Sequence, residues 1–172
     1  NSLPSANINT QIAGKPSSSQ PGSQRVQIRA IKASDTTNTP VCVPAFATGL
    51  HTINLGYQCL NSANCLNDDL KLSVGNTFDA ASALAIAHNN GPTFTNSIPV
   101  PLPFDALGSA TIAFRHDNVG QIALFADSYA IDVGNTVNRG SSNPFVVRPF
   151  ALTLDFGDSG DGDGDLFDMR AD

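Results

Sequence analysis

Apolar residues recur at every second position in many short runs of this chain, which is the pattern of half-buried β-strands. The alternation is clearest in residues 25–33, 51–57, 109–115, 120–126 and 151–156. Turn-forming Gly, Pro, Asn and Asp separate these runs, and none of the runs keeps the 3.6-residue period of an amphipathic helix. The pattern therefore predicts an all-β protein.

Further short apolar runs extend the series of predicted strands, at residues 40–46, 70–74, 83–87, 130–133 and 145–147. The Ala-rich stretch 80–88 is also compatible with a helical turn, but its β surroundings favour a strand. Three prolines within residues 98–104 exclude a central strand and predict an extended edge or connector. Asp117-Asn118 favours a hairpin turn between the flanking strands. About nine short strands with recurrent turns predict an Ig-like antiparallel β-sandwich.

The N-terminal segment differs from the rest of the chain, because it is rich in Ser and Pro and typical of an extended linker. Four alternate positions within it form one face of a short strand, namely Ala6, Ile8, Thr10 and Ile12. We expect this arm to pack on its own domain or on a neighbouring molecule. The predicted organisation is an arm, a sandwich and an acidic Gly/Asp tail, at residues 1–24, 25–156 and 157–172.

Charge is scarce and unevenly distributed. Charged residues make up 14% of the chain, and all 15 acidic residues are Asp. Residues 155–172 contain seven Asp and one basic residue, so this stretch carries a net charge of −6 and the remainder is neutral. The absence of a basic patch argues against nucleic acid as a partner. No apolar run approaches the ~20 residues of a membrane span. A neutral surface rich in Asn, Ser and Thr fits an extracellular protein.

The acidic tail contains a candidate calcium site. Ca²⁺ prefers six to eight hard oxygen ligands, and Asp at alternate positions of a Gly-rich loop supplies them. The candidate ligands are Asp161, Asp163, Asp165, Asp168 and Asp172. Their spacing follows that of an EF-hand loop, but Leu166 stands where that loop needs Gly, and Asp172 replaces its bidentate Glu. The tail thus predicts either a calcium site or a solvated acidic linker.

No catalytic constellation is visible in the sequence. His51, His88 and His116 are not accompanied by a nucleophile and a carboxylate in any known motif, and no Gly-x-Ser-x-Gly sequence occurs. Arg115-His116-Asp117 follows a predicted strand, so we expect it at a solvated hairpin tip. These observations predict a protein that is not an enzyme.

Several short motifs occur together in a specific order. They are Cys42-Val-Pro, the strand that ends at Cys59, the Asp117-Asn118-Val119-Gly120 turn with its following strand, and the Asn143-Pro-Phe-Val-Val-Arg-Pro-Phe run that ends at Phe150. In these motifs the chain resembles the MshQ-like proteins of mannose-sensitive haemagglutinin pilus biogenesis. The resemblance implies an extracellular bacterial surface module, pilus-associated or adhesin-like, that serves as a structural or binding unit of a surface fibre. Its implied partners are further copies of itself or other fibre proteins.

The three cysteines allow three single disulfides, each of which leaves one free thiol. The strand context of the family resemblance favours Cys42–Cys59, and Cys59–Cys65, which would close a small loop, competes with it. The Cys59 and Cys65 spacing, with no His nearby, does not match a zinc site.

Two alternative functions stay open at this point. The first is a filament subunit whose arm, with Ala6, Ile8, Thr10 and Ile12, adds a strand to a neighbour. The second is a calcium-dependent carbohydrate-binding module, which usually needs aromatic platforms. Aromatic residues make up only 7% of this chain, with no Trp and two Tyr, which argues against that alternative.

Overall fold

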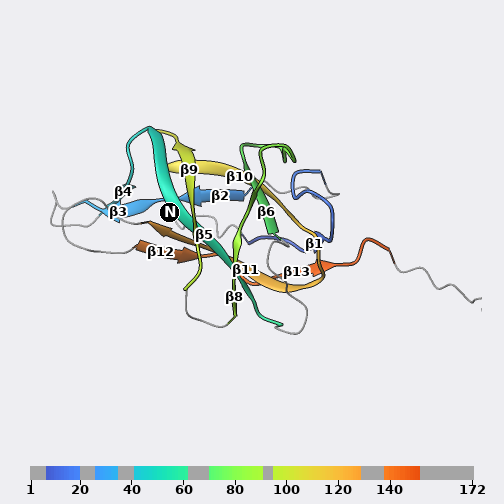
Figure 1. The fold of residues 1–172 in the computed structure, drawn as a ribbon. Helices are drawn as coiled ribbons and strands as arrows, with labels where there is room; N and C mark the ends of the chain where they lie inside the picture. Colours follow the sequence, from blue (N-terminus) through green and yellow to red (C-terminus); the bar gives the residue numbers. More distant parts are fainter. Residues whose placement is uncertain are drawn as a thin grey trace, which may run out of the picture.

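The computed structural model of the chain describes residues 7–19, 26–34, 41–61, 70–90, 95–128 and 138–151. These residues form thirteen strands and no helix, arranged as two curled layers with the core between them (Figure 1). The predicted all-β, Ig-like sandwich is therefore confirmed. The predicted strands at 130–133 and after Ala151 lie outside the described residues.

The larger layer is a seven-stranded sheet that is built around the longest strand, β5. Its members are β1 (Gln11–Ile12), β5 (Gly49–Cys59), β8 (Ala87–Asn90), β9 (Ile98–Phe104), β11 (Gly120–Ser128), β12 (Asn138–Ser141) and β13 (Phe145–Arg148). One edge of β5 pairs with β11, and the other edge pairs first with β9 and then with β8. β11 in turn pairs with β13 and β12. Most pairs are antiparallel, as predicted, but β1–β13 and β5–β8 are parallel.

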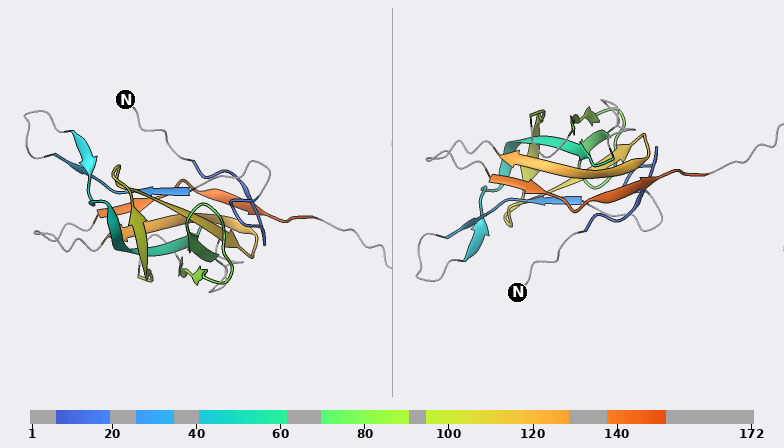
Figure 2. Two further views of the ribbon diagram at one scale, coloured as in Figure 1. Left: turned by 90° about the horizontal axis from the view of Figure 1, so that it is seen from above. Right: turned by 90° about the horizontal axis from the view of Figure 1, so that it is seen from below.

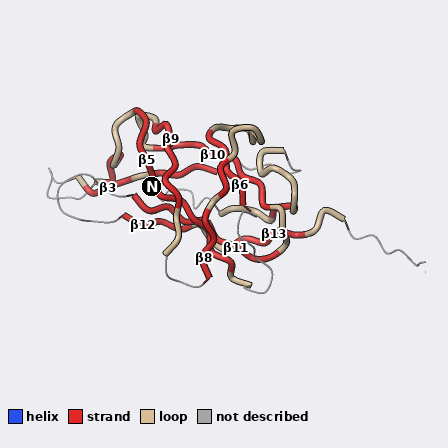
Figure 3. The backbone as a smooth tube through the Cα atoms, in the orientation of Figure 1, coloured by secondary structure: helices blue, strands red, loops and turns tan. Residues whose placement is uncertain are grey.

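The smaller layer is a four-stranded sheet in the order β2-β10-β6-β7. Its strands are β2 (Val26–Arg29), β6 (Leu70–Val74), β7 (Leu84–Ala85) and β10 (Ser109–His116). A separate ribbon pairs β3 (Ile31–Ala33) with β4 (Cys42–Pro44) and projects beyond the end of the sandwich (Figure 2). The tube in Figure 3 shows that the Ala-rich region before β8 contains no helix, so strand was the correct choice there.

The core forms because alternate side chains of each strand point to the same side of its sheet. Ile53, Leu55 and Tyr57 of β5 are buried, as their alternation predicted, and they pack against Leu72 of β6 and Phe114 of β10. The burial of apolar area in this cluster is the main driving force for the association of the two sheets.

The N-terminal segment packs on its own sandwich. Ile8 and Ile12 are buried, and β1 pairs with β13 of the same chain. The expected alternation holds only in part, because Thr10 is exposed and Gln11 is buried. Residues 7–19 therefore pack on the sandwich of their own chain, one of the two placements expected for this segment, and the predicted boundary at residue 24 lies outside the described residues. Ala6 lies outside the described residues.

Candidate functional site

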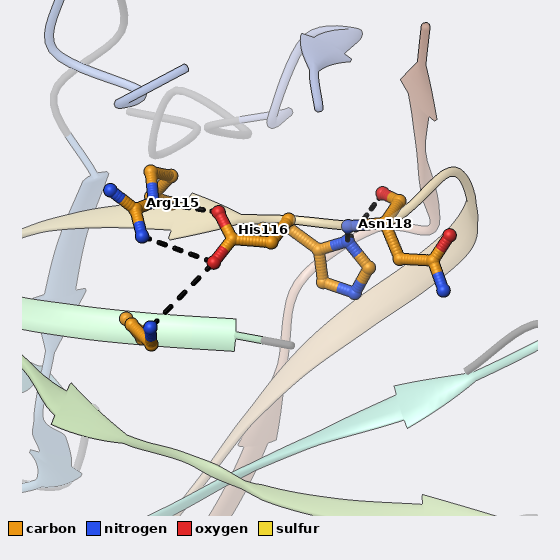
Figure 4. Close-up of polar contacts among 5 residues, drawn as sticks. Arg115, His116 and Asn118 are labelled. Atoms are coloured by element: carbon orange, nitrogen blue, oxygen red, sulfur yellow. Dashed lines mark hydrogen bonds and ion pairs between the residues drawn. The ribbon is translucent and has the colours of Figure 1, made fainter. Parts of the chain in front are cut away.

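The Asp117-Asn118 motif forms a corner between the two sheets and not the predicted hairpin. β10 belongs to the smaller sheet and β11 to the larger one, so the chain crosses the sandwich between them. Arg115 Nε lies 2.7 Å from Asp117 Oδ1, and Lys71 Nζ lies 3.8 Å from Asp117 Oδ2. Figure 4 shows these contacts beside His116, whose Nδ1 lies 2.6 Å from the carbonyl oxygen of Asn118. This polar cluster fixes the geometry of the crossing.

The histidines are packing residues of the sandwich. His88 and His116 both contact the buried Tyr57 ring, with centroid distances of 5.4 and 5.7 Å. His116 is only 2% exposed, so the expectation of a solvated tip was wrong for this residue. His51 stacks on Phe46 with a centroid distance of 4.7 Å. All three imidazoles are thus held by aromatic contacts.

The cysteines differ from the pairing that the family resemblance favoured. Cys42 is an exposed free thiol on the projecting β4, whereas Cys59 is buried at the end of β5 and is disulfide-bonded. The predicted Cys42–Cys59 bridge is therefore wrong, because β4 pairs with β3 in the separate ribbon and not with β5. The competing partner, Cys65, lies outside the described residues.

The predicted calcium ligands Asp161, Asp163, Asp165, Asp168 and Asp172 also lie outside the described residues, so the calcium site stays a prediction. Within the described part of the chain, no three His, Cys, Asp or Glu side chains are grouped so that they would hold a metal ion. None of the described segments is a helix of the length and apolar character that crossing a membrane requires.

The principal candidate site is a groove of about 580 Å³ between the edges of the two sheets. It opens between β2 of the smaller sheet and β12 of the larger sheet, and residues of both strands line it. Its walls are mainly apolar and include Ile28, Phe46, Ile53, Leu55, Leu72, Ile86, Ile112 and Leu124. The volume is within the range of ligand sites in proteins, about 300–1,000 Å³. The groove therefore suits an apolar and extended ligand.

One wall of the groove ends in an unused strand edge. The N–H of Ala30 donates to the carbonyl of Gly108, and Thr111 accepts from Gly75 on the β6 side of β10. Because backbone groups alternate along an antiparallel strand, the N–H and C=O of Gln27 and Arg29 point away from β10. No described strand pairs with this side of β2, which we call the open edge.

The outer edge of β9, in contrast, is closed by proline. The exposed residues of β9 are Pro99, Pro101 and Pro103. The residues that alternate with them are buried or half-buried. A proline has no N–H, so the three prolines leave the outer edge of β9 without donors while the strand pairs with β5 through its other residues. The predicted edge position of this segment is confirmed. Such an edge resists addition of a further strand.

The groove is not apparent from the sequence. The alternation in residues 25–33 predicts a strand with Val26 and Ile28 on one face, and both are half-buried in β2. Whether that strand lies at an edge depends on its partners, which periodicity does not specify. The one available signal was the concentration of basic residues in this strand, with Arg25, Arg29 and Lys32. Charged side chains are frequent on edge strands.

Residues 3–141 match a family described as a domain of unknown function (DUF6701), first Ig-like domain. No curated protein and no solved structure matches the chain significantly. Because the match covers most of the chain, the chain belongs to this family, and its Ig-like character agrees with the two-layered fold.

Proposed function

We propose that this domain is a non-enzymatic structural module of a bacterial surface fibre that accepts an extended polypeptide segment at the open edge of β2. The observation that carries the proposal is the apolar groove beside the open edge of β2, with which no strand in the described part of the chain pairs and where Gln27 and Arg29 are directed outward. Strand addition at such an edge draws affinity from main-chain hydrogen bonds and specificity from pockets for alternate side chains.

The geometry of β2 fits this mode of recognition. Val26 and Ile28 point toward the groove and are only half-buried, so a further strand beside them would bury more apolar surface. The main-chain groups of an added strand would pair with those of Gln27 and Arg29. The proline-blocked edge of β9 would not compete for the same segment.

An extracellular location and fibre partners are supported by sequence properties. Charged residues are few, at 14%, and the neutral polar surface fits a protein in an assembled extracellular structure. The similarity to MshQ-like proteins, in the motifs that end at Cys59 and Phe150, supports a pilus-associated or adhesin-like role. The proposed partners are other copies of this chain or other fibre proteins.

The alternative functions receive less support. Strand donation by the N-terminal arm would require Ile8 and Ile12 to leave the core of their own domain, where both are buried. No observation on the described residues favours a calcium-dependent carbohydrate-binding module, since its predicted ligands lie elsewhere in the chain.

The location is tested by immunogold electron microscopy of intact cells that encode the chain, with antibodies raised against the purified protein. We expect gold particles along surface fibres, and fewer after deletion of the gene. Labelling restricted to the cytoplasm of sectioned cells would contradict the proposed role.

Strand acceptance is tested by selecting displayed random peptides on the immobilised full chain. We expect enrichment of peptides with apolar residues at alternate positions. Gln27→Pro removes the outward N–H without affecting a hydrogen bond to β10, so it should abolish binding, whereas Gln27→Ala keeps the N–H and should bind normally. Equal binding by both variants would exclude the open edge as the site.

A further inference from the structure

The proposed function leaves the identity of the accepted strand open. We infer that the strand is residues 151–156 of a second copy of this chain. This inference rests on the proposed function, because it names the occupant of the same groove. Three features of the molecule support it: the sequence of that segment, the charge at the groove and the direction in which β13 leaves the domain.

The segment has the side-chain pattern that the groove requires. Leu152, Leu154 and Phe156 alternate with Ala151, Thr153 and Asp155, which is the pattern of a strand with one apolar face. Such a strand is not stable alone in water and needs both a sheet edge and an apolar surface. The open edge of β2 and the adjoining groove provide both.

Charge complementarity supports the same pairing. Two arginines line the groove, Arg29 on the β2 wall and Arg139 on the β12 wall, where Arg139 Nε lies 3.4 Å from Asp127 Oδ2. The side chain of Arg29 is exposed. The apolar segment is followed directly by the acidic tail, and residues 155–172 carry a net charge of −6. An apolar strand with an acidic extension therefore matches an apolar groove that carries the exposed Arg29 at its β2 wall.

The direction of β13 indicates a second copy and not the same molecule. β13 carries the chain away from β2 and toward the far end of the sandwich, where Arg148 lies opposite Ile12 of β1 (Figures 1 and 2). To reach its own β2, the segment would have to reverse its direction directly after Phe150. Donation to a neighbour needs no reversal, and because donor and acceptor surfaces differ, it would link subunits head to tail.

The test separates donor from acceptor in the full-length chain. Gln27→Pro disables the acceptor edge and leaves the segment intact, while the double variant Leu152→Asp/Leu154→Asp disables the segment and leaves the edge intact. We expect the unmodified chain to form oligomers that grow with concentration, and each variant alone to be monomeric by light scattering. Mixed together, the two variants should form a one-to-one dimer, because one working contact is restored. That dimer also shows that neither variant has lost its fold.

A disulfide trap tests the register and the second copy directly. In a Cys42→Ser background, Gln27→Cys and Thr153→Cys place one thiol on the open edge and one on the solvent side of the donated strand. We expect a covalent ladder of linked chains on a non-reducing gel, and no ladder when Asn76→Cys replaces Gln27→Cys. A closed monomer with an internal bridge would overturn donation between copies.

Ionic strength provides a further readout. Association should weaken between low and high salt, because Arg29 at the groove and the acidic tail attract each other through solvent. A mixture of the two variants that stays monomeric at all concentrations would overturn the inference. If peptides from the display selection still bind at Gln27 in that case, the proposed function stands and only the identity of the strand is wrong.

Discussion

The side-chain amide of Asn143 binds both backbone polar groups of Ile8, although the two residues are 135 positions apart. The Ile8 N–H donates to Asn143 Oδ1 at 2.7 Å, and Asn143 Nδ2 donates to the Ile8 carbonyl oxygen at 3.1 Å. The amide thus supplies the two hydrogen bonds that Ile8 would otherwise make with a neighbouring strand, and it holds the N-terminal segment against the larger sheet.

Replacing this amide should loosen the N-terminal segment. Asn143→Ala leaves both backbone groups of Ile8 without their partner, so we expect a loss of about 1–3 kcal/mol in the free energy of unfolding, measured with urea. The exposed Asn76 serves as the control, and Asn76→Ala should change stability by less than about 0.5 kcal/mol. Equal effects of the two substitutions would contradict the role of Asn143.

Position 56 requires glycine because the loop held by the buried Asn89 leaves no room there for a side chain. The side chain of Asn89 bonds the backbone of Thr95 and Asn96, and this loop lies directly over Gly56. A Cβ at Gly56 would lie 2.9 Å from the Asn96 carbonyl oxygen and 3.1 Å from Asn89 Nδ2. We expect Gly56→Ala to lower the free energy of unfolding by about 1–3 kcal/mol.

Gly140 on β12 provides the matched control for this substitution. A Cβ at Gly140 meets no heavy atom within 4 Å, so Gly140→Ala should leave the melting temperature almost unchanged. If Gly56→Ala is as well tolerated as Gly140→Ala, the loop at Asn96 does not lie as close to Gly56 in solution as the structure places it.

Asp79 stabilises the turn before β7 in its ionised form. Ser82 Oγ donates to its Oδ2 at 2.7 Å, and the Ala81 N–H donates to its Oδ1 at 3.0 Å. These hydrogen bonds, that of Ser82 first, lower the pKa of Asp79 below its ordinary value. The contribution to stability is therefore present above the pKa of the unfolded chain and is lost as the pH falls through the lower folded pKa.

The substitution Ser82→Ala removes the main cause of that shift. We expect the pKa of Asp79 to rise toward its ordinary value when it is followed by NMR of the carboxyl carbon. An unchanged titration curve in the variant would show that the hydroxyl does not bind the carboxylate in solution.

The cysteines give a chemical test of the corrected pairing. Because Cys42 is free and exposed and Cys59 is disulfide-bonded, we expect one alkylated thiol per unreduced chain, at Cys42, and a Cys59–Cys65 peptide pair by mass spectrometry. Replacing Cys59 and Cys65 by Ala should cost about 2–3 kcal/mol, the value expected for a short closed loop. Alkylation at Cys65 would contradict this pairing.

The sequence predicted which residues form strands better than which strands pair. Leu70–Val74 was expected as a strand and is found with the same bounds, and Ile53 and Leu55 point inward as their alternation required. Strand periodicity specifies the buried face of a strand but not its neighbour. The strands that flank Asp117 therefore looked like a hairpin, although they belong to different sheets.

The candidate site was less predictable than the fold for the same reason. The groove exists because β2 is the last strand of its sheet, and that position depends on how β10 and β6 pair. The burial of His116 against Tyr57 could not be predicted from the sequence either, because a polar residue beside a turn pair usually lies in solvent. Only the three prolines of β9 identified an edge directly, because their missing donors exclude a central position.

The central claim is that β2 presents an unpaired edge that a second copy covers. Amide hydrogen exchange by NMR tests it most directly, with the monomeric Leu152→Asp/Leu154→Asp variant compared with the assembled chain. We predict fast exchange at Gln27 and Arg29 in the variant, slow exchange at both in the assembled chain, and slow exchange at Ile28 in both, because its N–H points to β10. Protection of Gln27 in the monomeric variant would contradict the claim, since the edge would then already be covered.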